Sequence, residues 1–263
     1  MSFCKEILTM DKTSLGDRMK GYENIERKYL TKRTPMIIRI DGCHFHTFTK
    51  DFDRPFDISL SSCMADTARQ LCRDIMGAKL AYTQSDEISL LVMDDDTYET
   101  QPWFDKNLQK VTSVSAAMAT LDFNHAMKIA VECGFASKGL VKAFETFRPA
   151  LFDSRAFTLP REEALNYFIW RQRDCEKNSI QTLARMHFTQ KELYAMKCSD
   201  IREMLLAKGI DWDNVLTQNR LGVCVKKGED RKWFIDYQIP LFHDQPEYIE
   251  DLVYHRGENN EVG

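Results

Sequence analysis

The chain has 263 residues, of which 43% are hydrophobic, enough apolar material for one large domain or two small ones. Its formal net charge of −4 argues against a protein that coats nucleic acid non-specifically, because such binding relies on many Lys and Arg side chains. There is no run of about 18 apolar residues, and residues 1–11 lack a signal-peptide pattern. We therefore expect a cytoplasmic globular protein without a membrane partner. The eight cysteines form no Cys-x-x-Cys pair and are interpreted as free thiols.

The first elements are predicted from how the spacing of apolar residues changes along the chain. A polar helix is predicted from Leu15 to Leu30, and Pro35 separates it from a β-branched run, Met36 to Ile40, that is typical of a buried strand. Between Asp57 and Met76, apolar residues recur every three or four positions. This spacing predicts an amphipathic helix with Gly77 as its C-cap.

A β-hairpin is predicted next, with strands Ala78 to Gln84 and Glu87 to Met93 around a turn at Ser85 and Asp86. A long helix is expected between Pro102 and Glu132, whereas Phe144 to Leu159 is expected to be extended or irregular. The order strand, helix, hairpin, helix, strand is that of ferredoxin-like, palm-type folds. The sequence therefore predicts an α+β protein with an antiparallel sheet and packed helices.

The region after Pro160 is predicted to be mainly helical. Its expected elements are one helix over Arg161 to Met186, two shorter helices over Lys191 to Lys208, a hairpin formed by Leu221 to Lys227 and Trp233 to Ile239, and a frayed end over Glu250 to Gly263. We predict a palm-like catalytic core with an N-terminal helix over residues 1–160. Residues 161–263 are predicted to form a helical C-terminal region with a terminal hairpin, packed on that core.

Two acidic segments lie where predicted strands end. Asp41 follows the first strand and Asp86 lies in the hairpin turn, so their carboxylates are expected to meet at one edge of the sheet. Mg²⁺ is usually held by one or two carboxylates plus the phosphates of the substrate. We therefore predict a site for phosphoryl chemistry, with Asp41 and Asp86 as the catalytic pair and the Gly42 carbonyl as a further metal ligand. The competing interpretation of a single Asp-Gly dipeptide is an ordinary turn.

Several residues near Asp41 and Asp86 are also candidates for the site. The amides of residues 42–45 are suited to phosphate oxygens, His46 to a nucleotide contact and Arg54 to a triphosphate. Glu87 is either a third metal ligand or an outward-facing strand residue. The acidic run Asp94 to Asp96 is explained by a solvated turn, and we reject it as the metal site.

Taken in order, these motifs resemble the tRNA(His) guanylyltransferase family, including its guanylyltransferase-like relatives in bacteria and archaea. The matching segments are Leu15-Gly-Asp-Arg-Met-Lys20, Arg39-Ile-Asp-Gly42 with Phe45-His46, Gln84-Ser-Asp-Glu87, Phe152-Asp-Ser-Arg155 and Trp170-Arg-Gln-Arg-Asp-Cys175. The ordered set covers most of the chain and is more specific than any single motif.

The resemblance implies a nucleotidyltransferase that extends RNA in the 3′-to-5′ direction. It implies two Mg²⁺ ions held by Asp41, Gly42 and Asp86, with ATP, GTP or other nucleoside triphosphates as substrates. It also implies a homotetramer that binds tRNA. The implied nucleotide and triphosphate contacts are Gly42, Cys43, His44, Phe45, His46, Arg54 and Ser85. The candidate tRNA contacts are Arg171, Arg173, Lys177 and Asn178.

The segment after Asp174 and Cys175 indicates the branch. Eukaryotic guanylyltransferases carry His-Ile-Asn-Asn there, whereas this chain has Glu176-Lys-Asn-Ser179 and resembles the guanylyltransferase-like branch. That branch implies template-dependent addition of nucleotides to the 5′ end of truncated tRNAs, with ATP activation of 5′-monophosphate ends. A dedicated tRNA(His) guanylyltransferase, a nucleotide cyclase and a non-enzymatic tRNA-binding module remain alternatives. Two departures are Cys43, where the family often has Arg, and Leu221, where it often has Lys.

Overall fold

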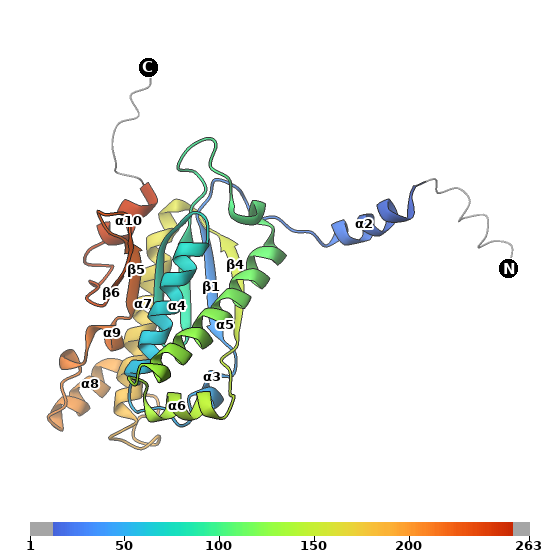
Figure 1. The fold of residues 1–263 in the computed structure, drawn as a ribbon. Helices are drawn as coiled ribbons and strands as arrows, with labels where there is room; N and C mark the ends of the chain where they lie inside the picture. The colour runs from blue at the N-terminus through green and yellow to red at the C-terminus, as the bar shows by residue number, and fades with distance from the viewer. Residues whose placement is uncertain (1–12, 255–263) are drawn as a thin grey trace, which may run out of the picture.

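The computed structural model describes residues 13–254, which fold around one six-stranded sheet with helices on both faces (Figure 1). The strands are β1 (Met36–Gly42), β2 (Ala78–Gln84), β3 (Glu87–Val92), β4 (Phe152–Thr158), β5 (Val223–Lys227) and β6 (Trp233–Asp236). Their order in the sheet is β4-β1-β3-β2-β5-β6, and all neighbours pair antiparallel. The predicted α+β, palm-type fold class is therefore confirmed.

Helices of very different length connect these strands. The α-helices are α2 (Leu15–Ile25), α3 (Phe45–Phe48), α4 (Ile58–Asp74), α5 (Leu108–Glu132), α6 (Lys138–Glu145), α7 (Arg161–Ala184), α8 (Cys198–Ala207), α9 (Thr217–Arg220) and α10 (Glu247–Tyr254). Two 3₁₀ segments are η1 (Trp103–Lys106) and η2 (Trp212–Asn214). Within residues 13–254, none of the helices combines the length and apolarity needed to cross a bilayer.

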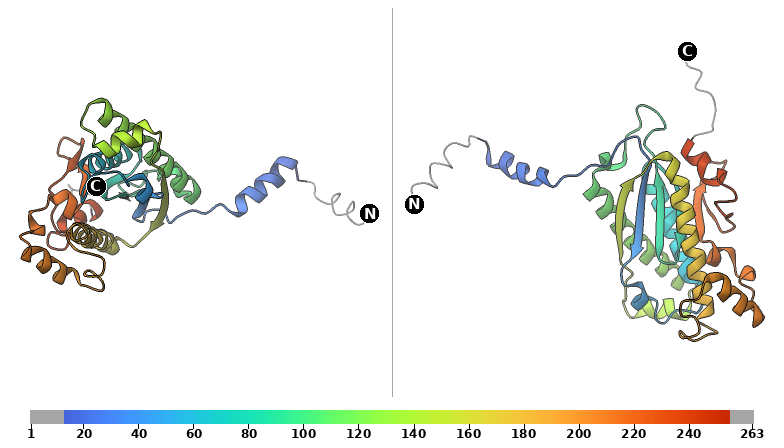
Figure 2. Two further views of the ribbon diagram at one scale, coloured as in Figure 1. Left: turned by 90° about the horizontal axis from the view of Figure 1, so that it is seen from below. Right: turned by 180° about the vertical axis from the view of Figure 1, so that it is seen from behind.

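The two faces of the sheet carry separate cores because strand side chains alternate. On β1, Ile38 and Ile40 point to the face covered by α4 and α5, whereas Ile37 points to the opposite face with residues of α7 and α10. Figure 2 shows α7 lying along one side of that second face. The strands β1, β2 and β3 are buried on both faces, which explains their nearly continuous apolar sequences.

Strand pairing brings the two predicted catalytic residues to the same end of the sheet. In the β1–β3 register Asp41 is opposite Glu87, and the Gly42 N–H donates to the Asp86 carbonyl at 3.0 Å. Ser85, which starts the hairpin turn, has a positive φ of 50°. The prediction that strand and hairpin bring Asp41 and Asp86 together is confirmed.

The strongest sequence patterns are confirmed as elements. The strand at Met36, the helix that begins after Asp57, the hairpin around Ser85, the helix that begins at Arg161 and the terminal hairpin all form. The Asp57 side chain caps α4 by accepting from the Leu60 N–H at 2.9 Å. Gly77 is not the cap of that helix. The cap is Ile75, and Gly77 follows it with a φ of 83°.

Other predicted boundaries are wrong. Helix α2 ends at Ile25 rather than Leu30. The long helix expected between Pro102 and Glu132 does form as α5, which Asn107 caps after the η1 turn. Only α8 forms in the region predicted to hold two short helices. The turn before α8, which begins at Thr189, stops where Ala195 adopts a φ of 58°.

Helix α6 was not predicted, and its end lies in the segment expected to be extended or irregular. Ser137 caps it, and Gly139 in its first turn lies against the Asp51–Phe52 backbone, where a Cβ atom would come within 2.5 Å. The later part of that segment is strand β4, as the palm-type order requires.

The end of the described chain is helical rather than frayed. Ile249 and Val253 of α10 are buried, which corrects the prediction for residues 250–254, and residues 255–263 lie outside the described range. Strand β5 pairs with β2, so the sheet continues beyond residue 160. The division into two parts at that residue stays a prediction.

Asp94 is not part of a solvated turn. It is 3% exposed, accepts from Lys106 Nζ at 2.9 Å and accepts from the Arg33 N–H at 2.9 Å. Lys106 Nζ also donates to the carbonyls of Thr31 and Thr34 at 2.8 and 2.7 Å. This buried pair fastens the segment before β1 to the start of α5.

Replacing Lys106 with Met should lower the free energy of unfolding by about 3–5 kcal/mol, because Asp94 then stays buried without its cation. Urea unfolding followed by circular dichroism measures this. Lys110→Met, a change at an exposed Lys near the start of α5, is the control and should leave stability close to wild type. Equal stability of the two variants would contradict a structural role for the buried pair.

Candidate active site

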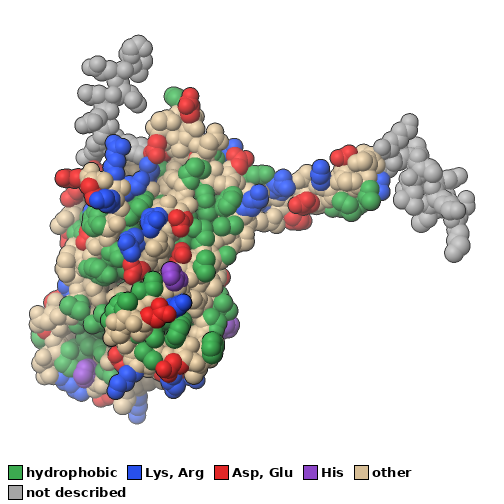
Figure 3. Space-filling model, viewed as in Figure 1, with side chains coloured by type: hydrophobic (Ala, Val, Ile, Leu, Met, Phe, Trp, Pro, Cys, Tyr) green, Lys and Arg blue, Asp and Glu red, His purple; other side chains and the backbone are tan. Residues whose placement is uncertain are grey.

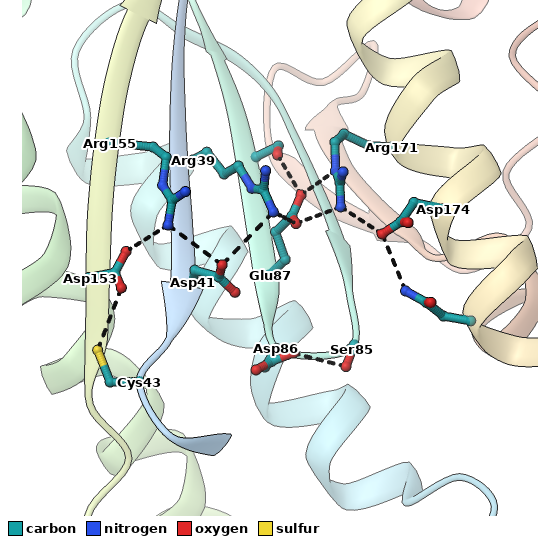
Figure 4. Close-up of polar contacts among 12 residues, drawn as sticks. Arg39, Asp41, Cys43, Ser85, Asp86, Glu87, Asp153, Arg155, Arg171 and Asp174 are labelled. Carbon is teal, nitrogen blue, oxygen red and sulfur yellow. Dashed lines mark hydrogen bonds and ion pairs between the residues drawn. The ribbon is translucent and has the colours of Figure 1, made fainter. Parts of the chain in front are cut away.

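The centre of the site is the pair Asp41 and Asp86, which come from the end of β1 and from the β2–β3 turn (Figure 4). Burial raises the pKa of Asp86, a hydrogen bond from Ser85 Oγ at 2.9 Å lowers it, and the nearby Asp41 charge raises it again. The net direction is upward. Two carboxylates that repel one another in this way favour a bound cation.

Glu87, next to Asp86, is fully occupied by donors. Arg171 binds it in a bidentate manner at 2.7 and 2.8 Å, Arg39 Nη2 lies 2.7 Å from Oε2, and Ser89 Oγ donates to Oε1 at 3.2 Å. These contacts fill about four acceptor positions of the carboxylate. Both interpretations from the sequence are therefore wrong, because Glu87 is neither free to bind a metal nor exposed on the strand.

The same contacts tie α7 to the hairpin. Arg171 Nη2 also binds Asp174 at 2.9 Å, and Asp174 accepts from Asn178 Nδ2 at 3.2 Å (Figure 4). Arg171 is only 4% exposed, so the prediction that it contacts tRNA directly is wrong. Its side chain binds Glu87 from α7 and so supports the hairpin that carries Asp86. Arg173, Lys177 and Asn178 are exposed and stay predicted tRNA contacts.

A pocket of about 400 Å³ opens beside Asp86, lined by residues of α3, α4, α7 and α9 and by the segment between α3 and α4. Of the residues predicted to contact nucleotide, it contains Phe45, His46, Arg54 and Ser85, whereas Gly42, Cys43 and His44 do not line it. The guanidinium of Arg54 donates to the Thr49 carbonyl at 3.3 Å and is exposed.

Sequence reasoning missed a set of polar side chains in this pocket. None of them has a hydrogen-bond partner within residues 13–254, although each carries a donor and an acceptor: Gln84, Thr182, Gln218 and Asn219. Uncommitted polar groups in a concave site are what a polar ligand requires. Gln218 and Asn219 lie on the one-turn helix α9, for which the sequence has no periodic signal.

The loop after β1 differs from the predicted phosphate cradle. The Gly42 amide donates to Asp86 and the Cys43 amide donates to the Leu151 carbonyl at 2.7 Å, so neither is free for phosphate. The N–H groups of Phe45 and His46, the first two of α3, have no intrahelical acceptor, whereas those of Thr47 and Phe48 donate to the His44 carbonyl at 2.9 and 3.3 Å. Gly42 is required for another reason, because a Cβ there would lie 2.2 Å from the Phe45 ring.

The side chains of this loop divide between core and surface. Phe45 is buried among Phe48, Phe123 and Phe152, while His44 and His46 are exposed with ring centroids 6.4 Å apart. Cys43 Sγ lies 3.8 Å from Asp153, and burial together with that carboxylate raises the pKa of the thiol. The thiol therefore stays protonated at neutral pH and is no substitute for a phosphate-binding Arg.

Two arginines approach Asp41 from the side opposite the pocket. Arg39 Nη2 lies 3.8 Å and Arg155 Nη2 3.7 Å from Asp41 Oδ2, and Arg155 also pairs with Asp153 at 3.3 Å. Sequence reasoning gave these arginines no role. Their only signal was membership of the motifs Arg39-Ile-Asp-Gly42 and Phe152-Asp-Ser-Arg155.

The donor set fits a metal ion that also binds its substrate. Within residues 13–254 there is no cluster of three or more Asp, Glu, His or Cys side chains suited to a metal, so no protein-only cage forms. Two carboxylates and a backbone carbonyl are hard oxygen donors, and Mg²⁺ commonly completes such a set with phosphate oxygens and water.

Comparison with known proteins supports this assignment of the fold. A model of the family described as tRNA(His) guanylyltransferase matches residues 16–160. A bacterial tRNA(His) guanylyltransferase-like protein solved with ATP is 43% identical and superposes with a TM-score of 0.83, covering 92% of this chain and 100% of that one. The corresponding structure with GTP is 40% identical, with a TM-score of 0.75 and the same coverage.

Similarity extends to eukaryotic relatives. The tRNA(His) guanylyltransferase of Debaryomyces hansenii is 26% identical over 212 residues, which are 75% of this chain and 75% of that protein. The matched family region contains both acidic segments, β4, and the helices α4 and α5 that cover one face of the sheet. The chain therefore belongs to the tRNA(His) guanylyltransferase family of nucleotidyltransferases.

Proposed function

We propose that this protein adds nucleotides to the 5′ end of tRNA in the 3′-to-5′ direction, directed by the opposing template base. The observation that carries the proposal is the juxtaposition of Asp41 and Asp86 with a pocket in which the side chains of Gln84, Thr182, Gln218 and Asn219 have no partner within the described chain. A 5′-monophosphate end would first be activated by ATP. That step joins AMP to the 5′ phosphate and releases pyrophosphate, and the 3′-hydroxyl of the incoming nucleotide would then attack the same phosphorus and displace AMP.

Asp41, Asp86 and the Gly42 carbonyl would hold Mg²⁺, two ions per site. Bound there, Mg²⁺ would supply charge neutralisation at the phosphate oxygens of an in-line displacement. The protein's own residues divide the remaining work. Arg54 and His46, which line the pocket, would contact the phosphates, whereas Asn178 and the side-chain amides of Gln218 and Asn219 offer neutral donors and acceptors.

The similar proteins give more direct support for the nucleotides that are used than for the identity of the tRNA substrate. The similar bacterial proteins were solved with ATP and with GTP, which favours a pocket that accepts either purine. A dedicated tRNA(His) guanylyltransferase also fits the family match, and a tRNA panel with varied opposing bases separates the two. Addition that follows the opposing base supports template direction, and guanylate alone on tRNA(His) supports the second function.

We also propose that the protein associates into a homotetramer. Helix α2 contributes no buried residue and stands apart from the body (Figure 1), yet it exposes the apolar stripe Leu15, Met19, Tyr22 and Ile25. A single-chain surface with Lys and Arg interspersed among acidic side chains (Figure 3) fits tRNA binding that several subunits share.

The cytoplasmic location stays a prediction.

Asp41→Ala and Asp86→Ala should each lower nucleotide addition at least about 100-fold, because each removes a ligand that supports several kcal/mol of transition-state stabilisation. The assay follows a labelled 5′-truncated tRNA with ATP, GTP and Mg²⁺. Asp96→Ala, at the opposite end of β3, is the control and should retain activity. Wild-type protein that binds tRNA but adds nothing would refute the enzymatic proposal, and full activity of either site variant would refute the assignment.

The raised pKa of Asp86 predicts a pH effect on the Mg²⁺ requirement. As pH falls toward that pKa, protons compete with the metal for the carboxylate, so the Mg²⁺ concentration for half-maximal activity should rise. Ser85→Ala removes the hydrogen bond that lowers this pKa. The variant should need more Mg²⁺ than wild type at acidic pH and equal Mg²⁺ at pH 8. Identical Mg²⁺ curves at every pH would contradict this role for Ser85.

Arg171 and Arg173 should behave differently although they are two residues apart. Arg171→Met should lower the free energy of unfolding by about 2–5 kcal/mol, since Glu87 loses its bidentate partner. Arg173→Ala should leave urea unfolding unchanged but weaken tRNA binding measured by fluorescence anisotropy. The opposite pattern would show that the burial of Arg171 does not decide its role.

A further inference from the structure

Within residues 13–254, no helix lies over the second sheet face at β4 and at the Arg39–Asp41 end of β1. Figure 2 (right) shows this open side of the sheet beside α7. The side chains of Asp153 and Arg155 on β4 are 57% and 53% exposed, in contrast to the buried residues where α7 covers β3 and β2. The pocket beside Asp86 lies on the other side of Asp41, so this uncovered part is a separate surface that reaches the same carboxylates.

A large aromatic side chain borders this uncovered sheet. Trp170 of α7 is 54% exposed, whereas Trp103 and Trp212 are 8% and 4% exposed. The guanidinium of Arg39 lies 5.9 Å from the centre of the Trp170 ring, and that of Arg171 lies 4.4 Å from it. Within residues 13–254 the indole N–H of Trp170 has no hydrogen-bond acceptor.

Cations continue from Trp170 along the exposed side of α7. Arg173 and Lys177 follow at spacings of three and four residues, which place them on the same helix face. Neither side chain has an ion-pair or hydrogen-bond partner among the described residues. The first turn of the same helix carries Glu162 and Glu163, and its Arg161 is paired with Asp95, so the cations of α7 without a partner lie beside the site.

We infer that this surface, formed by Arg39, Arg155, Trp170, Arg173 and Lys177, binds the 5′ end of the RNA, with the terminal base stacked on Trp170. The inference rests on the proposed function, because it assigns the second substrate of that reaction to the side of Asp41 that the nucleotide pocket does not use. An aromatic ring next to guanidinium groups suits a single unpaired base and its phosphate. An acidic protein partner fits less well, because it offers no base to stack on the exposed Trp170 ring.

The inference makes Trp170 a residue that touches substrate without taking part in the chemistry. Stacking tolerates any base, since every base has an aromatic face. A stacking contact would hold the 5′ end in place while the opposing template base decides which nucleotide enters. A contact that does not select the base suits a reaction that must accept many different 5′-terminal nucleotides.

The test compares Trp170→Ala with Trp170→Phe and Tyr98→Ala. Tyr98 is 96% exposed in the loop at the far end of β3 and serves as a matched aromatic control. Trp170→Ala should raise the dissociation constant and KM for 5′-truncated tRNA between about 5-fold and 150-fold while leaving the KM for ATP unchanged. Trp170→Phe should restore most of the affinity, and Tyr98→Ala should match wild type.

Quenching of tryptophan fluorescence gives a readout that does not depend on catalysis. RNA should quench wild-type emission, and the quench should be much smaller in Trp170→Phe, because that variant lacks the exposed indole. The inference is overturned if Trp170→Ala binds RNA like Tyr98→Ala, or if its KM for ATP rises as much as its KM for RNA. Wild-type protein that binds and is quenched but adds no nucleotide would instead refute the proposed function alone.

Discussion

The buried pairing of Glu87 with Arg171 and Arg39 is the interaction on which the site depends. It joins α7 to the β2–β3 hairpin and to β1, three parts of the chain that are distant in sequence. A carboxylate in this position needs all of its donors, because burying an unpaired charge costs several kcal/mol. The arginines supply them, and in doing so they fix the hairpin against α7. Asp86 is thereby held at the tip of the hairpin, Asp41 beside it and Asn178 at the wall of the pocket.

This arrangement explains how two adjacent acidic residues differ. Glu87 is the first residue of β3 and points to the sheet face covered by α7, whereas Asp86 belongs to the turn and stays next to the pocket. One carboxylate is neutralised by permanent cations of the protein, and the other keeps its acceptor positions for a cation from solution. The same contrast applies to the two arginines of the Trp170-Arg-Gln-Arg-Asp-Cys175 motif, of which Arg171 is buried and Arg173 exposed.

Much of the fold was predictable because its signals are local. The β-branched run of β1, the three-to-four spacing of α4 and the hairpin turn at Ser85 each follow from a short stretch of sequence, and Asp41 and Asp86 follow from where those elements end. The errors about individual side chains concern contacts between distant residues, whereas the other errors are element boundaries and the missed helix α6. The partner of Glu87 is 84 positions away, so its burial could not be read from its neighbours. Asp94 looked solvated because Lys106 reaches it only in the folded chain. Gln218 and Asn219 enter the pocket from a single turn of helix that no periodicity predicts.

The account assigns divalent-ion binding to Asp86 with Asp41, and a purely supporting position to Glu87. The most direct measurement is a titration with Mn²⁺ in the presence of nucleoside triphosphate, followed by water-proton relaxation, on Asp86→Asn and Glu87→Gln. Both variants are first compared with wild type by circular dichroism, because Glu87→Gln leaves the buried Arg171 and the partly buried Arg39 with a weaker partner. We predict that folded Glu87→Gln keeps saturable Mn²⁺ binding and that Asp86→Asn loses it. Loss of binding in folded Glu87→Gln, together with retained binding in Asp86→Asn, would contradict the account.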